Sequence, residues 1–528
     1  MRYPAINIYS LIFLLAAFLF SGCQQSKKTF DDLVEGEVKI TLNPYERVPL
    51  GAQIDFRTTE ICGVELEVEG RIPVKRSFDL KRRFHQVPLV GLYPDTVNRV
   101  NIKLITNEGE EYSRSFEVKT DTLPSFFPEI EIVKADRSRM EPGFHLVELL
   151  IAKNGKFLPY TVMFDDDGKV RWFMDMSFLG QIGFSAYRIR SGNWLYLSWI
   201  GIYEMSELGQ MVNEQQMWGN AGSHEIIELP NGDLLMGGSK KDSRILRGDR
   251  MFNSRYDFVV EWNREGVGKT VREWDLRDVL DVDRMVFPPD YSLDSRSDWF
   301  HINSVAISPK DNCIVVSGRN QGVVKVDMQN NLKWILAPHR AWGKAGFDGT
   351  GFETSDYLLT AVDTNGNPFP ANVQLGIEGR DDFEWSTGQH ALNVMENGHL
   401  LLFDNGLMRN FDQTPTYSRA VEYAIDENDR TIRQVWEYGK ERGLDLYSPI
   451  TSDVDILPET GNRLITAGTI RKSGDAPHAK MVEVTYPDKD EVFEAKIIFK
   501  DALGTGEQVW AQFDLVFRGE RYPLFSQE

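Results

Sequence analysis

The chain has 528 residues, 41% of them hydrophobic, which predicts a soluble globular protein with two or more domains. Its formal net charge is −20, and no cluster of lysine and arginine interrupts the acidic character, so a nucleic-acid-binding protein is excluded. An anionic small substrate is not excluded, because a pocket can carry a local field opposite to that of the whole molecule.

The N-terminal residues predict export and lipidation. Ile6–Phe20 is an apolar run too short for an ordinary membrane span, it follows a positively charged start, and small residues and a cysteine end it at Cys23. This is typical of a bacterial lipoprotein signal peptide at residues 1–22, with a lipid on Cys23 of the mature chain. An uncleaved signal anchor is the alternative. Residues 23–33 are polar and are expected to form a tether.

This N-terminus places the protein on the periplasmic side of the bacterial envelope, anchored by lipid. Gln24 follows the cysteine, where an aspartate would mark inner-membrane retention in enterobacteria, so we expect the outer membrane. A homodimer is one assembly that the sequence permits.

Residues 34–125 contain short runs of alternating apolar and polar residues, separated by turns at intervals of roughly ten. This pattern predicts a small β-sandwich of the immunoglobulin or fibronectin-III type, without chemistry of its own. His85, next to a basic run, is interpreted as part of a solvated strand. Cys62 and Cys313 are interpreted as small buried side chains, so we expect no disulfide framework.

Residues 126–528 contain an internal repeat of paired hairpins, four strands to a unit, which predicts an all-β domain of the β-propeller type with about six blades. The units lie near 145–173, 185–217, 224–276, 301–336, 390–438 and 453–499. Val509–Phe517 is expected to pair with an earlier strand and close the ring. The insertions 276–300 and 337–389 are expected to be loops or short helices. Tryptophans recur in the outer hairpins and are expected to pack between blades: Trp172, Trp274, Trp334 and Trp436.

Three of the eight histidines directly precede the apolar first strand of a unit: His224, His301 and His390. In a propeller these strands line the central channel, and residues at their starts point into its mouth. We therefore expect the three histidines to meet at an active site. The remaining histidines of this domain occupy no equivalent position and are expected to be structural or exposed: His145, His339, His399 and His478.

Counting back across each hairpin turn places partners beside these histidines. Arg319 falls within one position of the residue opposite His301, Asn405 opposite His390, and Ser239 opposite His224. An amide or hydroxyl there can fix the tautomer of an imidazole. For Asn405 the alternative is that Asp404-Asn405-Gly406 merely ends the strand in a turn.

Three imidazoles and an arginine suit two kinds of chemistry. A catalytic metal site would use the histidines as ligands, but Arg319 would then place a fixed positive charge beside the cation, and no companion carboxylate occupies an equivalent position. Transfer of an anionic group fits better: a neutral imidazole attacks, and cations stabilise the charge on the oxygens. We therefore expect neither a metal nor a cofactor.

The sequence also resembles a family, the bacterial arylsulfate sulfotransferases, which use no nucleotide sulfate donor. The resemblance covers essentially the whole mature chain and rests on the motifs DWFHINSV with SGR, SHEIIELPNGDLL, QHALNVMENGHLLLFDNG and SRAVEYAID with VWEYG. It implies a six-bladed propeller that moves a sulfuryl group from a phenolic sulfate to an acceptor phenol.

By the same resemblance, His390 would be the nucleophile that becomes transiently sulfated, in a ping-pong mechanism. His301 and Arg319 would bind the sulfuryl oxygens, and His224 would assist. Some enterobacterial members are soluble in the periplasm and carry a disulfide near the active site; this chain has a lipobox and no evident cysteine pair, so those features are not transferred to it.

Two other functions stay open at this point. The first is a non-catalytic surface lipoprotein whose propeller binds a glycan or a protein. The second is a metal-dependent hydrolase. Aromatic residues of the two insertions would shape any substrate pocket, but their spacing does not say which of them line it: Phe287, Tyr291, Trp299, Trp342, Phe347, Tyr357 and Trp385.

Overall fold

The computed structural model describes residues 28–179, 184–284, 297–471, 475–500 and 513–525. The predicted signal peptide, Cys23, Phe287 and Tyr291 lie outside these ranges. The chain divides into two compact units: Met1–Lys39, Ile54–Val87 and Arg99–Glu117 form the first, and Ile40–Gln53, Pro88–Asn98 and Val118–Glu528 form the second. Within the described residues, no helix has both the length and the apolar character needed to span a membrane.

The N-terminal strands form one sheet in the order β1-β2-β4-β5, with β3 paired to β2. Along β4 every second residue is buried, and Val100, Ile102 and Leu104 are fully enclosed, as expected for strands with one face on a core. The bounds are α2 (Phe30–Leu33), β1 (Val34–Leu42), β2 (Ala52–Val68), β3 (Val74–Leu89), β4 (Val97–Thr106) and β5 (Glu111–Lys119).

The interpretation of His85 as a solvated residue is wrong. Its side chain is 1% exposed and stacks on Phe56, with ring centroids 4.5 Å apart, and Nε2 lies 3.2 Å from the Thr58 hydroxyl. Burial lowers the pKa of His85 to about 4, so the imidazole is neutral. Burial alternates in this part of β3, because His85, Val87 and Leu89 are buried while Phe84 and Gln86 are exposed.

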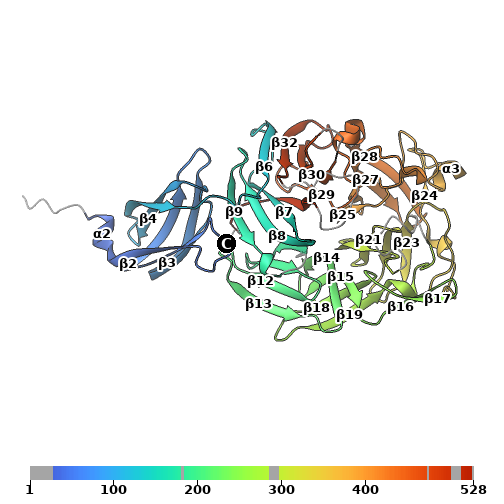
Figure 1. The fold of residues 1–528 in the computed structure, drawn as a ribbon, viewed down its shortest axis with the longest axis horizontal. Coiled ribbons are helices and arrows are strands. Elements are labelled where there is room, and N and C mark those ends of the chain that lie inside the picture. The colour runs from blue at the N-terminus through green and yellow to red at the C-terminus, as the bar shows by residue number, and fades with distance from the viewer. Residues whose placement is uncertain (1–27, 180–183, 285–296, 472–474, 501–512, 526–528) are drawn as a thin grey trace, which may run out of the picture. The chain divides into compact units, whose positions relative to one another are not determined.

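The second unit is built from antiparallel sheets of four strands each, arranged as in a propeller (Figure 1). Three of these sheets follow the chain directly. They are β10 (Phe184–Arg188), β11 (Trp194–Leu197), β12 (Gly201–Met205) and β13 (Met211–Gln216); β14 (Asn220–Glu228), β15 (Leu234–Lys240), β18 (Phe258–Asn263) and β19 (Lys269–Asp275); and β20 (Ile302–Ile307), β21 (Ile314–Gly318), β22 (Gly322–Val326) and β23 (Leu332–Leu336).

The other sheets of this unit combine segments that are distant in sequence. They are β25 (His390–Val394), β26 (Leu400–Asp404), β27 (Arg419–Asp426) and β28 (Thr431–Tyr438), extended by the parallel β24 (Thr360–Ala361); β29 (Asp453–Ile456), β30 (Arg463–Ile470), β31 (His478–Val484) and β32 (Glu491–Ile498), extended by β6 (Glu129–Ala135); and β33 (Leu515–Tyr522) with β7 (Phe144–Lys153), β8 (Lys156–Phe164) and β9 (Val170–Asp175). The described residues thus contain six sheets of this kind.

Both ends of the second unit take part in closing it. β33, near the C-terminus, pairs with β7, and β6 pairs with β32. The expectation that the final apolar segment pairs with an earlier strand is confirmed from Leu515 onward. Contacts also join β7 to β10, because the carboxylate of Glu148 accepts hydrogen bonds from the backbone N–H groups of Ser185 (3.1 Å) and Ala186 (2.7 Å).

The outer tryptophans connect each sheet to the next, as expected. The indole N–H of Trp172 donates to the carbonyl of Glu207, that of Trp274 to the carbonyl of Asp327, and that of Trp436 to the carbonyl of Pro487, at 2.9 to 3.2 Å. Trp334 reaches the side chain of Glu427 in the same way. Each indole buries its ring between sheets and satisfies its donor on the neighbouring hairpin.

Short connections complete the unit. A two-stranded ribbon, β16 (Arg244–Arg247) with β17 (Arg250–Asn253), lies between β15 and β18 in sequence. The long insertions contain loops and short helices, as expected. The helices are η1 (Ser177–Leu179), η2 (Leu276–Asp278), η4 (Thr354–Tyr357), α3 (Ala371–Gln374), η5 (Arg409–Phe411) and η6 (Lys440–Asp445). Cys62 and Cys313 are buried and form no disulfide.

Candidate active site

The structure brings His224, His301 and His390 together. The ring centroid of His224 lies 5.0 Å from that of His301 and 6.4 Å from that of His390. His390 begins β25 and His301 directly precedes β20, as the repeat indicated, whereas His224 lies in the middle of β14 and not before it. His224 and His390 are buried, and His301 is partly exposed.

A β-bulge lies next to each of these histidines. The register shifts between Ser223 and Ile226 in β14, after Ile302 in β20, and after His390 in β25. The backbone is left-handed at His224 (φ 58°) and His301 (φ 61°), which is uncommon for residues other than glycine. Because a bulge inserts an unpaired residue and turns its side chain, it allows neighbouring strands to aim their imidazoles at one place.

The bulges also change two pairings that hairpin counting predicted. Ser239 lies opposite Ala221, not opposite His224, and its hydroxyl accepts a hydrogen bond from the backbone N–H of Tyr256. His390 lies opposite Phe403, so the predicted ladder position of Asn405 is wrong as well. The side chain of Asn405 nevertheless reaches His390. Arg319 is placed as predicted: its backbone N–H donates to the carbonyl of His301 at 3.0 Å.

Asn405 fixes the tautomer of His390. The amide nitrogen of Asn405 donates to the carbonyls of Ser448 (2.7 Å) and Thr451 (3.0 Å), so its Oδ1 is left as the acceptor for His390 Nδ1, at 2.7 Å. The carbonyl of Gly388 lies 3.1 Å from His390 Nδ1 and, as an acceptor, also requires a proton on that nitrogen. Nδ1 therefore carries the proton, and Nε2 carries the lone pair of the neutral ring. Nε2 makes no hydrogen bond within the described residues.

His301 and His224 also turn Nδ1 toward the protein. Nδ1 of His301 donates to the carboxylate of Asp298, and Nδ1 of His224 lies 2.7 Å from the hydroxyl of Ser223. That hydroxyl is 3.2 Å from the carbonyl of Ile302, to which it can donate, so it can accept the Nδ1 proton of His224. The Nδ1 atoms of all three rings thus face polar groups of the protein.

Burial keeps two of the imidazoles neutral. Desolvation, together with nearby positive charge, lowers the pKa of His390 to about 3 and holds the pKa of His224 well below its ordinary value. The hydrogen bond from His390 to Asn405 acts in the opposite direction but is the smaller effect. The guanidinium of Arg319 contributes to the lowering at both rings, so its charge is felt across the cluster.

Sequence reasoning missed several groups around the histidines. Asp298 is one, although it stands in the motif DWFH three residues before His301, a spacing that a hydrogen-bonded acid–imidazole pair could have suggested. Tyr256 is another, with its ring centroid 5.3 Å from that of His301. Phe517 approaches His224 with centroids 5.4 Å apart. Neither aromatic residue stands in a motif: Tyr256 lies in the connection before β18, and Phe517 lies on β33.

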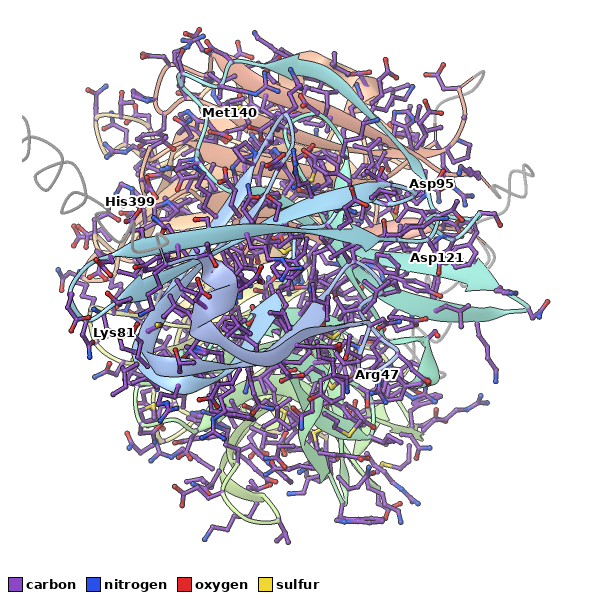
Figure 2. The ribbon with its side chains drawn as sticks, turned by 90° about the vertical axis from the view of Figure 1, so that its left-hand side faces the viewer. Arg47, Lys81, Asp95, Asp121, Met140 and His399 are labelled. Carbon is purple, nitrogen blue, oxygen red and sulfur yellow. The ribbon has the colours of Figure 1, made fainter. Side chains whose placement is uncertain are left out.

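The four histidines expected to stay outside the site do so. His399 is labelled in Figure 2, and its Nδ1 lies 2.7 Å from the carboxylate of Glu422; His145 stacks on Phe164 and Phe493. The ring nitrogens of His339 and His478 lie 2.8 Å from backbone carbonyls, those of Leu359 and Ala476.

A second buried group of charges lies on the same inner strands. Arg518 of β33 makes a two-pronged ion pair with Glu225 of β14, at 2.6 and 2.8 Å, and Ser304 of β20 also donates to Glu225 at 3.0 Å. Further carboxyl groups act on Arg518 from the surrounding strands: Glu148, Asp453, Asp455 and Glu520. These five acidic residues are named here the carboxyl cluster.

Burial shifts the carboxyl cluster in the opposite sense to the imidazoles. Desolvation raises the pKa values of Glu148 and Asp453 to about 7 and holds those of Asp455 and Glu520 well above the ordinary range. The ligand atoms of Asp453, Asp455 and Glu520 lie within 4.8 Å of one another, a spacing that a cation could bridge.

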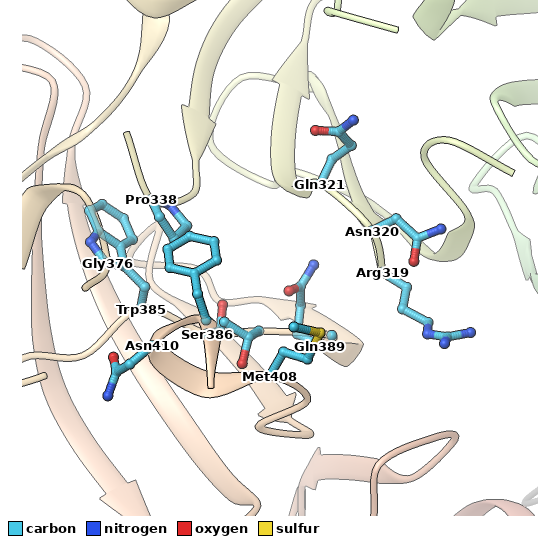
Figure 3. A pocket seen from close by; sticks show the side chains of 13 residues that line it. Arg319, Asn320, Gln321, Pro338, Gly376, Trp385, Ser386, Gln389, Met408 and Asn410 are labelled. Atoms are coloured by element: carbon cyan, nitrogen blue, oxygen red, sulfur yellow. The ribbon is translucent and has the colours of Figure 1, made fainter. Parts of the chain in front are cut away.

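A pocket with a volume of about 20 Å³, room for about one water molecule, lies beside Arg319 and the segment that precedes His390 (Figure 3). Arg319 lies on one side of it and Trp385 on the other, and Gly388 and Gln389, directly before His390, also line it. Of the described insertion aromatics, Trp385 lines this pocket. Trp299 is buried with its indole N–H on Asp257.

Two protein families together match most of the chain. A family described as arylsulfotransferase (ASST) matches residues 129–503, and one described as the arylsulfotransferase Ig-like domain matches residues 39–122, as the predicted N-terminal sandwich requires. A protein of unknown function from Bacteroides caccae is similar in structure at a TM-score of 0.24 and 15% identity, covering 52% of this chain and 93% of its own.

Two curated relatives extend over most of the chain. The arylsulfate sulfotransferase AssT of Escherichia coli O6:H1 (strain CFT073) is 27% identical over 550 residues, and that of Lelliottia amnigena is 26% identical over 549 residues. Each alignment covers 87% of this chain and 90% of the relative. The protein is thus an enzyme of the sulfotransferase class. Because the first family match spans more than half of the sequence, the chain belongs to the arylsulfotransferase (ASST) family.

Proposed function

We propose that the protein transfers a sulfuryl group from a phenolic sulfate to an acceptor phenol in two steps, through a sulfated His390. In the first step, Nε2 of His390 attacks sulfur, the N–S bond forms, the S–O bond to the ring breaks, and a phenolate leaves. In the second step, the oxygen of the acceptor phenol attacks the same sulfur and the N–S bond breaks. The atoms balance without a nucleotide or a metal.

The observation that carries the proposal is the fixed tautomer of His390. A nucleophilic imidazole must keep the proton on one nitrogen and the lone pair on the other. The amide of Asn405 imposes that state, because its nitrogen is committed to two carbonyls and only its oxygen faces Nδ1. The low pKa of His390, about 3, keeps the lone pair available even in mildly acidic solution.

The neighbouring groups complete the chemistry. The guanidinium of Arg319 is a fixed cation close enough to act on both buried rings, and we assign it to the sulfuryl oxygens, whose charge it stabilises during transfer. Nδ1 of His301 donates to the carboxylate of Asp298, which orients the ring. We therefore assign His301 as the acid that protonates the departing phenolate and the base that receives the proton of the acceptor. His224 is assigned to assist at the same centre as His301.

The test follows release of a chromogenic phenol from 4-nitrophenyl sulfate, with and without phenol as acceptor. Acceptor-dependent release is expected, and mass spectrometry of protein quenched after donor alone should find a sulfuryl group on the peptide that contains His390. Absence of release under both conditions would contradict the activity. Release without a covalent adduct, together with full activity of His390→Ala, would contradict the two-step route.

For the N-terminus we propose lipidation at Cys23 and anchoring in the outer membrane, facing the periplasm. The support is the sequence alone: a short apolar run that ends in small residues and a cysteine. Labelling of the full chain with a radioactive or alkyne-bearing fatty acid, compared with Cys23→Ala, tests it. Equal labelling of both would overturn the assignment, and recovery in the inner-membrane fraction would overturn the location.

A further inference from the structure

The N-terminal unit has an exposed basic and apolar segment at one edge of its sheet. β3 lies at that edge, since it pairs with β2 and with no other strand of the described chain. Along Leu80–Phe84 of β3, four of the five side chains are exposed, and the fifth, that of Arg82, is half-buried. Leu80 and Phe84 are 66% and 60% exposed and flank three consecutive basic residues, of which Lys81 is labelled in Figure 2. Leu80–Phe84 is named here the edge segment.

Protection of the sheet edge explains the cations but not the apolar side chains. Natural sheets place lysine and other charged residues on edge strands, because the charges discourage pairing with another chain. Leu80 and Phe84 have the opposite effect, since large exposed apolar side chains add to the free energy gained when an edge is covered. The edge segment therefore has the composition of a docking surface for a partner that is both anionic and apolar.

The chain enters this unit beside the edge segment. The ammonium group of Lys28, the first described residue, forms an ion pair with the carboxylate of Glu60 on β2. Two residues earlier on β2, the carbonyl of Thr58 accepts a hydrogen bond from Nε of Arg83, at 3.1 Å. The start of the described chain and the edge segment thus contact the same short stretch of β2.

The next residues of β2 support this placement. Burial raises the pKa of the Cys62 thiol, and the positive charges of Lys28 and Lys81 both act against that rise. Ile61, between Glu60 and Cys62, is 44% exposed and adds apolar surface to this part of the unit. The point where the chain enters and the edge segment therefore belong to one region of the N-terminal unit.

Covalent geometry limits how far this region can lie from the membrane. Lys28 is five residues after Cys23, the residue proposed to carry the lipid, and five residues of fully extended chain span at most about 18 Å. The edge segment is therefore held close to the headgroups of the bilayer. At such a surface cations are attracted to anionic headgroups, and leucine and phenylalanine side chains enter the boundary between headgroups and acyl chains.

A second copy of the chain fits this edge less well. Pairing of β3 with its counterpart in another copy, centred on the edge segment, would place the basic residues Lys81–Arg83 of both strands opposite each other. Like charges directly opposite each other on paired strands are destabilising. An anionic membrane surface instead complements their charge.

We propose that the edge segment docks the N-terminal unit on the anionic phospholipid surface of the membrane that holds the lipid anchor. Lys81 and Arg82 contact lipid phosphates, and Leu80 and Phe84 enter the boundary with the acyl chains. Arg83 contributes less, because its guanidinium is paired with Glu35 at 2.7 Å. The inference rests on the proposed lipidation of Cys23, and it adds a noncovalent contact that fixes which side of the N-terminal unit faces the bilayer.

The test uses the full mature chain with Cys23→Ser, so that acyl chains cannot carry the binding. Flotation measures its partition onto vesicles of phosphatidylcholine alone, and onto vesicles of phosphatidylcholine and phosphatidylglycerol in a ratio of about 2:1. We expect partition onto the anionic vesicles to be about tenfold higher in about 50 mM salt. That advantage should disappear in about 500 mM salt, because salt screens the attraction between cations and headgroups.

Charge variants assign the binding to the edge segment. Lys81→Glu combined with Arg82→Glu should lower partition onto anionic vesicles by about tenfold or more. Lys241→Glu combined with Arg250→Glu is the matched control, because both side chains are exposed, both lie in the second unit, and the net charge changes by the same amount. This control should lose less than about twofold, since charges beyond a Debye length from the membrane are screened.

Apolar variants test the second part of the contact. Leu80→Ser combined with Phe84→Ser should lower partition by about tenfold while its dependence on salt stays that of the wild type. Met251→Ser combined with Val267→Ser is the control: these side chains are 50% and 91% exposed in the second unit, and partition should not change. Thermal unfolding of each variant at the wild-type temperature excludes misfolding as the cause.

The outcomes separate this proposal from lipidation itself. Equal partition onto both kinds of vesicle, or equal losses in the edge-segment variants and their controls, would overturn the docking surface even where fatty-acid labelling of Cys23 succeeds. Failure of that labelling, with binding that still depends on the edge segment, would overturn the anchor and leave the surface in place. A dimer in light scattering that Leu80→Ser/Phe84→Ser converts to single chains would assign the edge to a second copy and overturn the proposal.

Discussion

The inner strands of the second unit hold two buried titratable groups that respond oppositely to the same environment. The histidine cluster (His224, His301 and His390) lies beside Arg319, and the carboxyl cluster surrounds Arg518. Burial lowers the pKa values of His224 and His390 and raises those of carboxyl groups such as Glu148, because it disfavours the charged form of each group.

The difference shows what makes one cluster reactive. A deprotonated imidazole presents a lone pair, and Asn405 determines which nitrogen presents it, so in the proposed reaction desolvation prepares His390 for attack. A protonated carboxyl group is a weak nucleophile. The carboxyl cluster instead holds Arg518, whose ion pair with Glu225 joins β33 to β14. One group serves chemistry, and the other serves the position of the strands.

The largest effect is expected for His390→Ala, which should lower kcat for sulfuryl transfer by on the order of a thousandfold or more, since no other group can form the N–S bond. Stability should change little in comparison, because the side-chain hydrogen bond of the ring, to Asn405 at the end of β26, lies within one sheet. Chromogenic phenol release and thermal unfolding measure the two. A variant with near-normal kcat would show that the histidine cluster is not the nucleophilic one.

Arg518→Met should instead act on stability, lowering the free energy of unfolding by about 3–5 kcal/mol, because it leaves Glu225 buried without its cation. Urea unfolding measures the loss. The double variant Arg518→Met/Glu225→Gln is the control and should recover part of it, since the uncompensated charge is gone. Equal losses in the single and double variants would mean that packing, rather than the ion pair, sets the cost.

Asn405→Ala should lower kcat by roughly a hundredfold, because His390 loses the acceptor that fixes its tautomer. KM for the donor should change less. Asn393→Ala is a matched control. Asn393 lies on β25, the strand of His390, and its amide also donates to a backbone carbonyl, that of Val454 at 2.7 Å. A similar fall in kcat for both variants would assign the effect to general disturbance of β25.

Asp298→Asn should lower kcat by about tenfold to a hundredfold, since the carboxylate that orients His301 becomes an amide. Because His301 is assigned as acid and base, the effect should be larger for phenols that are poor leaving groups than for 4-nitrophenol. The slope of log kcat against leaving-group pKa measures this. An equal loss with every donor would contradict the assignment of His301.

The smallest effect concerns pH. The pKa of His390 is lowered on folding, so it contributes stability that is present above the unfolded value near 6.5 and is lost as the pH falls toward about 3. The pKa values of Glu148 and Asp453 are raised on folding, so these groups contribute stability that is lost as the pH rises through about 7. Asp455→Asn removes one of these carboxyl groups. It should raise the free energy of unfolding at pH 8 by on the order of 1 kcal/mol and change it less at pH 5.

Denaturant unfolding at both pH values compares the variant with the wild type. Thr466→Val, on the neighbouring strand β30, gives the response of a buried substitution without a titrating group and should show no dependence on pH. Stabilisation of Asp455→Asn that is equal at pH 5 and pH 8 would contradict a raised pKa at this position.

Much of the fold was predictable from local pattern. The repeat of hairpins gave the limits of the sheets to within a few residues, because each unit must alternate strands and turns, and the recurring tryptophans indicated how the sheets contact each other. The pairing of Leu515–Tyr522 with β7 was also predictable, since a ring requires its last strand to meet its first. The burial of His85 was not predicted, because the basic residues beside it indicated an exposed strand although His85 lies on the face toward the core.

The sequence by itself determined that His224, His301, His390 and Arg319 lie close together. The histidines recur in the inner hairpins of the repeat, and Arg319 follows from the length of one hairpin. Only the tertiary structure decided how they function. Bulges shift the register beyond what counting across a turn can follow, so the partners Asp298, Ser223 and Asn405 are fixed by backbone geometry, and the pKa of His390 depends on burial by strands that are distant in sequence.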